Sequence, residues 1–399
     1  MSPPGRPKGE FGPQRARTEG SSASVVVAQC RAGFEAEAAA DLAAVALASG
    51  AAVRTDALPG SGYVAGHPQP FDAQRWPKAL AAAPPIFIRS LFFGSGPHRI
   101  VAAAPSRGRP DRVAPLAALF AALPRDTRLP GVPAPARGPA VFGELRLETP
   151  DTNDGKELSS LCRAIDPPLA AALIAGGTLL APMPQDAARR LPALHVFFAD
   201  GANAYVGASA PPWGSRWTMG IPRLRMPQGA PSRSTLKLAE AIVTFLGERE
   251  LELLHAGMRA VDLGAAPGGW TWQLVERGLR VTAVDNGPLK GGLADDPLVR
   301  HLRVDGLAFV PPRPVDWLVC DIVEQPSKIA ALIGRWIGRG HARHALFNLK
   351  LPMKKRYDEV QRCRAVIAEA LAGTRAGGTL GLRQLYHDRE EVTGFASRD

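Results

Sequence analysis

The run AVDLGAAPGGW at residues 260–270 constrains the fold more than any other feature of the sequence. A short apolar run enters a glycine-rich turn, which predicts a buried strand, a tight turn and then a helix. Glycines there let a ligand approach the backbone, and the first amides of the helix face that ligand. The GxGxxG spacing of dinucleotide-binding proteins is absent and Pro267 lies within the turn, so a pyrophosphate-binding site is the second interpretation.

Helices and strands alternate around this run. We expect helices at 235–246 and 270–276, and strands at 260–263, 280–284, 302–304, 317–320 and 345–350. This alternation predicts a doubly wound α/β domain at 234–399. The carboxylate of Asp285 follows the second strand, a position that suits hydrogen bonds from a ribose diol. Asp305 follows the third strand, although Asp-Gly is also ordinary turn chemistry.

The front half of the chain has a different pattern. A strand at 24–30, a helix at 34–49 and strands at 52–55 and 62–65 predict an α+β domain of the ferredoxin-like kind at 22–83. A second unit at 84–210 should contain strands at 86–93 and 140–148, helices at 112–123 and 158–174, and a hairpin at 194–198 and 204–207. Pro167 and Pro168 should interrupt the second of these helices. We expect a disordered tail at 1–21 and a loop at 125–138.

Charge and cysteine content limit the possible partners. The chain has 48 Lys and Arg against 37 Asp and Glu, a net charge of +11 that favours a nucleic acid. No apolar run is long enough to span a membrane, and residues 1–20 lack the apolar core of a secretory signal. The four cysteines form no CxxC pair, which argues against disulfides and zinc and agrees with a reducing cytoplasm.

A basic linker at 211–233 contains no acidic residue. Arginines alternate there with Trp213, Trp217 and Met226, which is typical of a segment that follows an RNA strand. A plain connector whose tryptophans are buried against a domain explains the same pattern equally well.

Together with three further runs, the glycine-rich run makes the sequence similar to a known family: DLGAAPGGWT, VDNGP, CDIVEQP and FNLKLPMKKRY. The chain resembles the ribosomal RNA 2′-O-ribose methyltransferases of the FtsJ/fibrillarin-like superfamily, in particular the bacterial M-type family that modifies a large-subunit cytidine. The resemblance implies a Rossmann-like domain that uses S-adenosyl-L-methionine, preceded by ferredoxin-like and THUMP RNA-binding domains. It also implies naked or immature 23S ribosomal RNA as the partner, a cytidine in the peptidyl-transferase region as the target, no metal, and a monomer in the cytoplasm.

The resemblance further implies site residues. A catalytic Lys-Asp-Lys-Glu tetrad corresponds to Lys237, Asp321, Lys350 and Glu391. Glu390 is the rival for the fourth place, because strand alternation puts only one of the two on the site. The implied cofactor-binding residues are Ser234, Gly264, Ala266, Pro267, Gly268, Gly269, Asp285, Asp305 and Asp321. The expected RNA contacts are Arg216, Arg223, Arg225, Arg233, Lys354, Lys355 and Arg356.

The chemistry of 2′-O-methylation explains why a lysine is needed. A ribose 2′-hydroxyl is a very weak acid, so a base must accept its proton during attack on the methyl group. We assign Lys350 as this base, with Asp321 holding it and with Lys237 and Glu391 positioning the substrate. Lys237 lowers the pKa of Lys350 and Asp321 raises it, so the net direction is open. His387 is the alternative base.

Two other functions are alternatives to ribose methylation. A base methyltransferase requires an Asn-Pro-Pro-Tyr-type motif or a catalytic cysteine, and neither motif occurs. An RNA-binding assembly factor with a vestigial cofactor site would have lost the glycine turn or the tetrad. The strand that follows Glu391 is expected to be short or irregular. Trp270, Trp272 and Cys320 are expected to serve packing.

Overall fold

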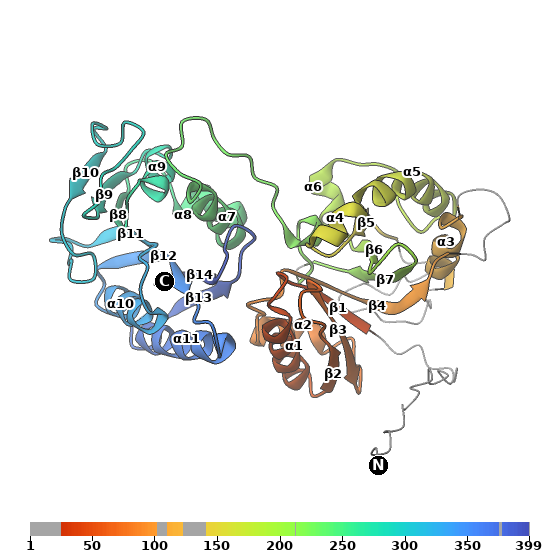
Figure 1. Cartoon of the computed structure of the whole chain (residues 1–399). Coiled ribbons are helices and arrows are strands. Elements are labelled where there is room, and N and C mark those ends of the chain that lie inside the picture. Colours follow the sequence, from red (N-terminus) through yellow and green to blue (C-terminus); the bar gives the residue numbers. More distant parts are fainter. Residues whose placement is uncertain (1–24, 102–109, 123–140, 212, 375–376, 399) are drawn as a thin grey trace, which may run out of the picture.

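The computed structural model contains two seven-stranded sheets, one in each half of the chain (Figure 1). It describes residues 25–101, 110–122, 141–211, 213–374 and 377–398. The tail expected at 1–21 and the loop expected at 125–138 lie outside these residues. No helix among the described residues is long and apolar enough to cross a membrane.

The first sheet has the order β2-β3-β1-β4-β7-β6-β5. Its strands are β1 Val25–Gln29, β2 Ala52–Asp56, β3 Tyr63–Gln69, β4 Ser90–Arg99, β5 Glu144–Glu148, β6 Ala193–Phe198 and β7 Asn203–Ser209. Its helices are α1 Glu35–Ala48, α2 Trp76–Ala82, α3 Val113–Ala122, α4 Asn153–Glu157, α5 Ser159–Ala175 and α6 Gln185–Ala188. Strand β4 pairs with both β1 and β7, so one sheet runs through the two units expected at 22–83 and 84–210. Their division into two domains stays a prediction.

Two predicted elements of the front half differ from the structure. The strand expected at 86–93 begins only at Ser90, because the amides of Ile86, Phe87 and Ile88 donate to Asp41 Oδ2 at 2.5–3.3 Å. The interruption expected at Pro167 and Pro168 is also wrong, since α5 continues through both prolines. Both are exposed, and the opposite face of the helix packs on the sheet. Carbonyl groups freed by the prolines therefore remain accessible to water.

The second sheet has the order β10-β9-β8-β11-β12-β14-β13. Its strands are β8 Arg259–Leu263, β9 Arg280–Val284, β10 Val299–Leu302, β11 Val315–Cys320, β12 Ala342–Lys350, β13 Gly378–Arg383 and β14 Glu391–Arg398. The first five are parallel, while β14 runs antiparallel to β12 and to β13. Our expectation of a short last strand is wrong, because β14 is paired along both edges. Strand β13, which contains three glycine or threonine residues, had not been predicted.

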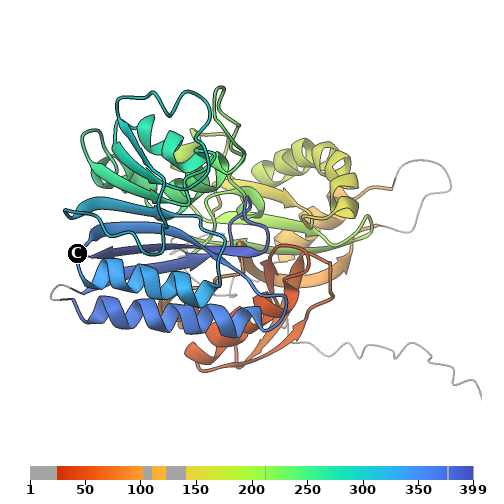
Figure 2. The same cartoon turned by 60° about the vertical axis from the view of Figure 1, so that its left-hand side comes forward.

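Helices cover both faces of the second sheet. Helices α7 Thr235–Phe245, α8 Glu250–Leu253 and α9 Gly269–Val275 lie on one face, and α10 Pro326–Gly338 and α11 Arg356–Ala372 on the other (Figure 2). Short 3-10 turns occur at η1 Thr218–Gly220 and η2 Gly247–Arg249. This doubly wound arrangement agrees with the predicted fold class.

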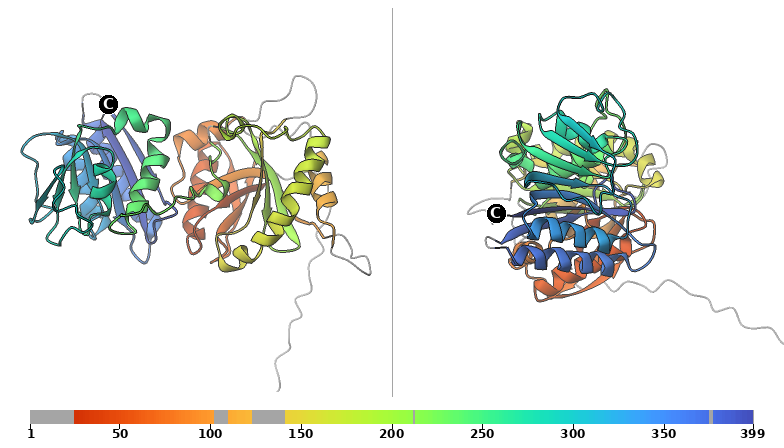
Figure 3. Two further views of the ribbon diagram at one scale, coloured as in Figure 1. Left: turned by 90° about the horizontal axis from the view of Figure 1, so that it is seen from above. Right: turned by 90° about the vertical axis from the view of Figure 1, so that its left-hand side faces the viewer.

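The two halves lie side by side and are joined by specific contacts (Figure 3). Arg356 donates from Nε to Glu37 Oε1 at 2.8 Å, and its guanidinium lies 4.0 Å from the ring centre of Phe34. Arg31 Nη1 donates to the carbonyl of Asp388 at 2.8 Å. The backbone amide of Gln384 donates to a carbonyl of the front half at 2.7 Å. The second half is thus fixed against α1 and against the segments that follow β1 and precede β4 in the front half.

Candidate active site

The glycine turn lies where the strand order of the second sheet reverses. Strand β8 pairs with β9 on one side and with β11 on the other, and ligands bind α/β sheets at such a point. Gly264 has a φ of +79°, and a Cβ there would lie 2.9 Å from Ile322 Cγ1. Gly268 has a φ of +114°. The turn therefore requires glycine at both positions.

Asp285 is tied to this turn. It follows β9, and its Oδ2 accepts from the amide of Ala266 at 3.0 Å, while its Oδ1 accepts from the amide of Gly287 at 2.7 Å. A carboxylate oxygen can accept further hydrogen bonds, so a ribose diol fits this donor and acceptor set. Asp305 is exposed, three residues beyond β10, and its Oδ1 accepts from the amide of Leu307 at 2.9 Å. Its role toward a cofactor stays a prediction.

Other predicted cofactor residues surround the same turn. Ser234 precedes α7, its Oγ lies 2.6 Å from Ser232 Oγ, and its carbonyl accepts from Trp270 Nε1 at 3.1 Å. Pro267 and Gly269 belong to the turn and to the first turn of α9. The first residues of α7 thus pack directly on the glycine turn. Their cofactor contacts remain predictions.

The four tetrad residues converge. Lys350 Nζ donates to Asp321 Oδ1 at 2.6 Å and also to Glu391 Oε2. Lys237 Nζ lies 3.7 Å from Asp321 Oδ2 and is in direct contact with Glu391 Oε1. All four side chains are less than a quarter exposed, with Glu391 at 5%. Two lysines and two carboxylates make the cluster neutral, which lowers the cost of burying it.

Backbone register sets this geometry. Lys350 ends β12 and Glu391 begins β14, and the two are direct partners across the strand pair. Glu390 instead turns outward, is 66% exposed and contacts Arg356. Strand alternation therefore directs Glu391, and not Glu390, to the cluster.

The net direction of the Lys350 pKa is upward. Burial lowers the pKa, but the charges of Asp321 and Glu391 and their hydrogen bonds raise it further, so the ammonium form is favoured. Asp321 thus holds Lys350 in place and also keeps it protonated.

Sequence reasoning missed a hydrogen-bonded network behind the tetrad. Asn348 donates from Nδ2 to Asp321 Oδ1 at 2.9 Å and accepts from Thr393 Oγ1 at 2.7 Å. Thr393 also lies within hydrogen-bond distance of both oxygens of Asp388, whose pKa is raised well above its usual range by burial and by the nearby Glu391 charge. Asn348 and Thr393 lie two residues from Lys350 and Glu391, so strand alternation could have identified them.

The predicted RNA residues fall into three groups. Arg223, Arg225, Arg233, Lys354 and Lys355 are exposed. Arg216 is half-exposed and pairs with Glu248 at 3.0 Å. Arg356 forms the third group, because its guanidinium is held by Glu37, by the carbonyl of Gly33 and by Glu390. These bonds tie Arg356 to the front half, and its expected RNA contact stays a prediction.

Five side chains with other expected roles have defined surroundings. His387 Nδ1 lies 2.6 Å from Glu240 Oε2 on α7. Cys320 is fully buried, and burial raises the pKa of its thiol to about 12. Trp270 is buried and Trp272 packs partly against the core. Trp213 of the linker packs edge-on to Phe93 at 5.1 Å, as a connector with a buried tryptophan would.

Two family models match separate parts of the chain. A family model described as "Ribosomal RNA large subunit methyltransferase M, N-terminal" matches residues 111–210, and one described as "FtsJ-like methyltransferase" matches residues 230–364. Among solved structures, fibrillarin from Aeropyrum pernix with bound S-adenosyl-L-methionine is 18% identical and covers 50% of this chain and 81% of its own, at a TM-score of 0.32. A likeness this distant bears on neither the cofactor nor the substrate of this chain.

Two curated relatives match nearly the whole chain. The "Ribosomal RNA large subunit methyltransferase M" of Methylococcus capsulatus is 48% identical over 94% of this chain and 98% of its own length. The protein of the same name from Azoarcus sp. (strain BH72) is 45% identical over 94% of this chain and 96% of its own. The chain therefore belongs to the ribosomal RNA large subunit methyltransferase M family.

Proposed function

We propose that the protein transfers a methyl group from S-adenosyl-L-methionine to the ribose 2′-hydroxyl of a cytidine in 23S ribosomal RNA. The observation that carries this proposal is the meeting of Lys350, Asp321, Lys237 and Glu391 beside the glycine turn. The names of the relatives support ribosomal RNA as the substrate. The earlier resemblance supports the cytidine and the peptidyl-transferase region.

The glycine turn is the site proposed for the methyl donor. S-adenosyl-L-methionine supplies an electrophilic methyl group on a sulfonium. Asp285 would hold the ribose diol, and Asp305 the adenine amine. The turn residues Gly264, Ala266, Pro267, Gly268 and Gly269, together with Ser234 and Asp321, line the remainder.

Lys350 is the proposed general base. Its neutral Nζ would accept the 2′-hydroxyl proton as the oxygen bonds to the methyl carbon, and the bond from that carbon to the sulfonium sulfur would break to leave a neutral thioether. Asp321 fixes the position of the amine. Because the pKa of Lys350 is raised, most molecules carry the ammonium at neutral pH and must lose that proton before transfer. RNA that covers the cluster would strengthen the desolvation that lowers this pKa. Lys237 and Glu391 position the ribose.

The front half and the basic linker are proposed to hold the RNA. Arg223, Arg225 and Arg233 are exposed on the segment between the two sheets, and Lys354 and Lys355 lie close in sequence to Lys350. Phosphate contacts of this kind provide affinity without sequence selection. We retain the ferredoxin-like and THUMP-like units at 22–83 and 84–210 as the proposed RNA-binding domains, acting on naked or immature RNA.

The product of the reaction tests the proposal. Purified protein is incubated with methyl-labelled S-adenosyl-L-methionine and unmodified large-subunit RNA, and the RNA is then digested to nucleosides. We expect the label in 2′-O-methylcytidine. Label in a base-methylated nucleoside would assign another chemistry. Cofactor binding without any incorporation into RNA would favour an assembly factor with a vestigial site.

A further inference from the structure

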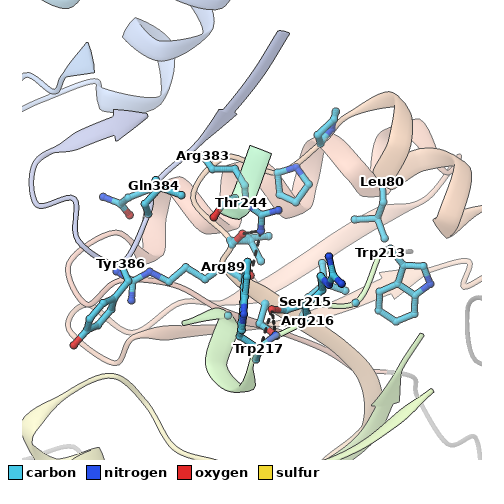
Figure 4. Close-up of a pocket in the computed structure, with 18 of the residues that line it drawn as sticks. Leu80, Arg89, Trp213, Ser215, Arg216, Trp217, Thr244, Arg383, Gln384 and Tyr386 are labelled. Carbon is cyan, nitrogen blue, oxygen red and sulfur yellow. Dashed lines mark hydrogen bonds between the residues drawn. The ribbon is translucent and has the colours of Figure 1, made fainter. Parts of the chain in front are cut away.

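A cavity of about 380 Å³ lies between the two halves of the molecule, and none of the four tetrad residues lines it (Figure 4). Its walls come from α2, the start of β4, the linker, α7 and the segment that follows β13. The segment contributes Gln384 and Tyr386, and the linker contributes Trp213 and Trp217. The cavity is therefore bounded by both halves and by the segment that joins them.

Buried polar groups of this cavity lack hydrogen-bond partners among the described residues. They are Arg89 Nε and Nη2, Ser90 Oγ, Trp213 Nε1 and Gln384 Oε1. Arg89 and Ser90 are each 4% exposed and Gln384 is 1% exposed. A buried polar group without a partner costs about 1–3 kcal/mol, so proteins rarely leave several around one cavity. The set has mostly donors, which suits a ligand rich in acceptors.

The charge of the lining also favours an anion. Arg89, Arg216 and Arg383 are opposed by Glu240 alone. Arg89 Nη1 and Arg216 each have a carboxylate partner outside the cavity lining, Asp151 and Glu248. Arg383 Nη2 donates to the carbonyls of residues 88 and 89, both at 3.1 Å.

Glu240 does not neutralise this positive character. Both of its oxygens accept from the backbone amides of Tyr386 and His387, each at 2.8 Å. Its hydrogen bonds are therefore made to the segment after β13. Its charge still acts on Arg383, but one carboxylate against three guanidinium groups leaves the lining positive.

Aromatic rings complete the site. Trp217 and Tyr386 line the cavity, and both are partly exposed. The guanidinium of Arg89 lies over the ring of Tyr386, 5.4 Å from its centre, so the charge and one face of the ring are adjacent in the lining. Bases stack on such rings beside arginines that hold the phosphate. An apolar ligand would leave the buried donors without partners.

We propose that this cavity binds one nucleotide of the RNA substrate, its phosphate at Arg89 and Arg383 and its base against Trp217 or Tyr386. The inference rests on the proposed function, because it assumes an RNA substrate. The nucleotide bound there is distinct from the methylated one. It anchors the strand at the junction between the halves.

Two variants and one crosslink test this site. Thr244 lines the cavity from α7 and is partly buried. Thr244→Phe fills space without removing charge, and Arg89→Gln removes the unpartnered donors. We expect each to weaken binding of unmodified large-subunit RNA by about tenfold, the effect of one lost charged contact. Arg89→Gln should also reduce the slope of log affinity against log salt by about 1. Arg339→Gln, at the exposed residue that follows α10, is the matched control.

Ultraviolet crosslinking of the wild-type complex locates the RNA directly. We expect crosslinked peptides that contain Trp217 or Tyr386, and their loss in Thr244→Phe. Unchanged RNA affinity in Thr244→Phe, or crosslinks confined to other peptides, overturns the site. If Arg89→Gln does not fold, Thr244→Phe and the wild-type crosslink still decide. If the protein methylates RNA but these crosslinks are absent, only the proposed nucleotide site is contradicted. If the crosslinks form but no RNA is methylated, only the proposed function is contradicted.

Discussion

Replacing Lys350 tests the proposed base most directly. The tetrad contains two positive and two negative side chains, so Lys350→Ala leaves a net charge of −1, whereas Lys350→Arg keeps the cluster neutral. An arginine cannot accept the proton near neutral pH, because its guanidinium stays protonated. Both variants should therefore lose transfer, and only the alanine variant also changes the charge of the site.

The expected loss is large. Removal of a positioned general base costs ~10²–10⁴ in rate. This range corresponds to about 3–5 kcal/mol of transition-state stabilisation. For the wild-type protein, the raised pKa of Lys350 means that the neutral fraction increases about tenfold per pH unit below that pKa. The single-turnover rate should rise in proportion over this range, and both variants should lose the dependence.

Single-turnover transfer of labelled methyl groups to RNA measures these rates, with calorimetry of cofactor binding in parallel. Lys328→Ala is the matched control and should keep the wild-type rate. Lys328 is a half-exposed residue of α10 that pairs with Glu324, which precedes this helix. A Lys350→Arg variant that binds both ligands and retains more than a tenth of the rate would refute Lys350 as the base. His387 is then the first alternative to test and Lys237 the second.

Three further outcomes are expected. Asp285→Ala should weaken cofactor binding by about 1–3 kcal/mol in calorimetry, and an unchanged affinity would remove Asp285 from the ribose. The double variant Arg223→Gln with Arg225→Gln should reduce the slope of log RNA affinity against log salt by about 2. The control is Arg362→Gln, at an exposed arginine, and equal slopes in the two proteins would exclude the linker from phosphate contact. Burial raises the pKa of Asp41 to about 7, so the folded state binds the extra proton and wild-type stability should fall as pH rises from about 4 to about 7. Asp41→Asn should remove this loss of up to about 4 kcal/mol in chemical denaturation, and a pH profile like that of the wild type would contradict it.

The catalytic half could be predicted well because its signals are local. The glycine turn and the apolar strands before Asp285 and Asp321 each have a short pattern that identifies them. Strand β13 was missed since its sequence, GTLGLR, has two glycines and weak alternation. This strand forms because it pairs with β14, and no local sequence pattern predicts that pairing.

Contacts between distant segments were not predictable. Arg356 adjoins two exposed lysines in sequence, which favoured an RNA contact, but Glu37 and Phe34 are more than 300 residues away along the chain. The early end of the strand expected at 86–93 similarly depends on Asp41. The choice between Glu390 and Glu391 required the register of β14 against β12.

The contacts between the halves have a consequence for how the active site is built. Residues 384–390 connect β13 to Glu391. The front half holds this connection through Arg31, just after β1, and through the carbonyl of Ile86, just before β4. Glu240 holds the same connection from α7. A displacement of the front sheet is therefore transmitted to Glu391 over a few tightly bonded residues. The catalytic geometry belongs to the assembled chain, and the front half acts as part of the mechanical frame of the active site.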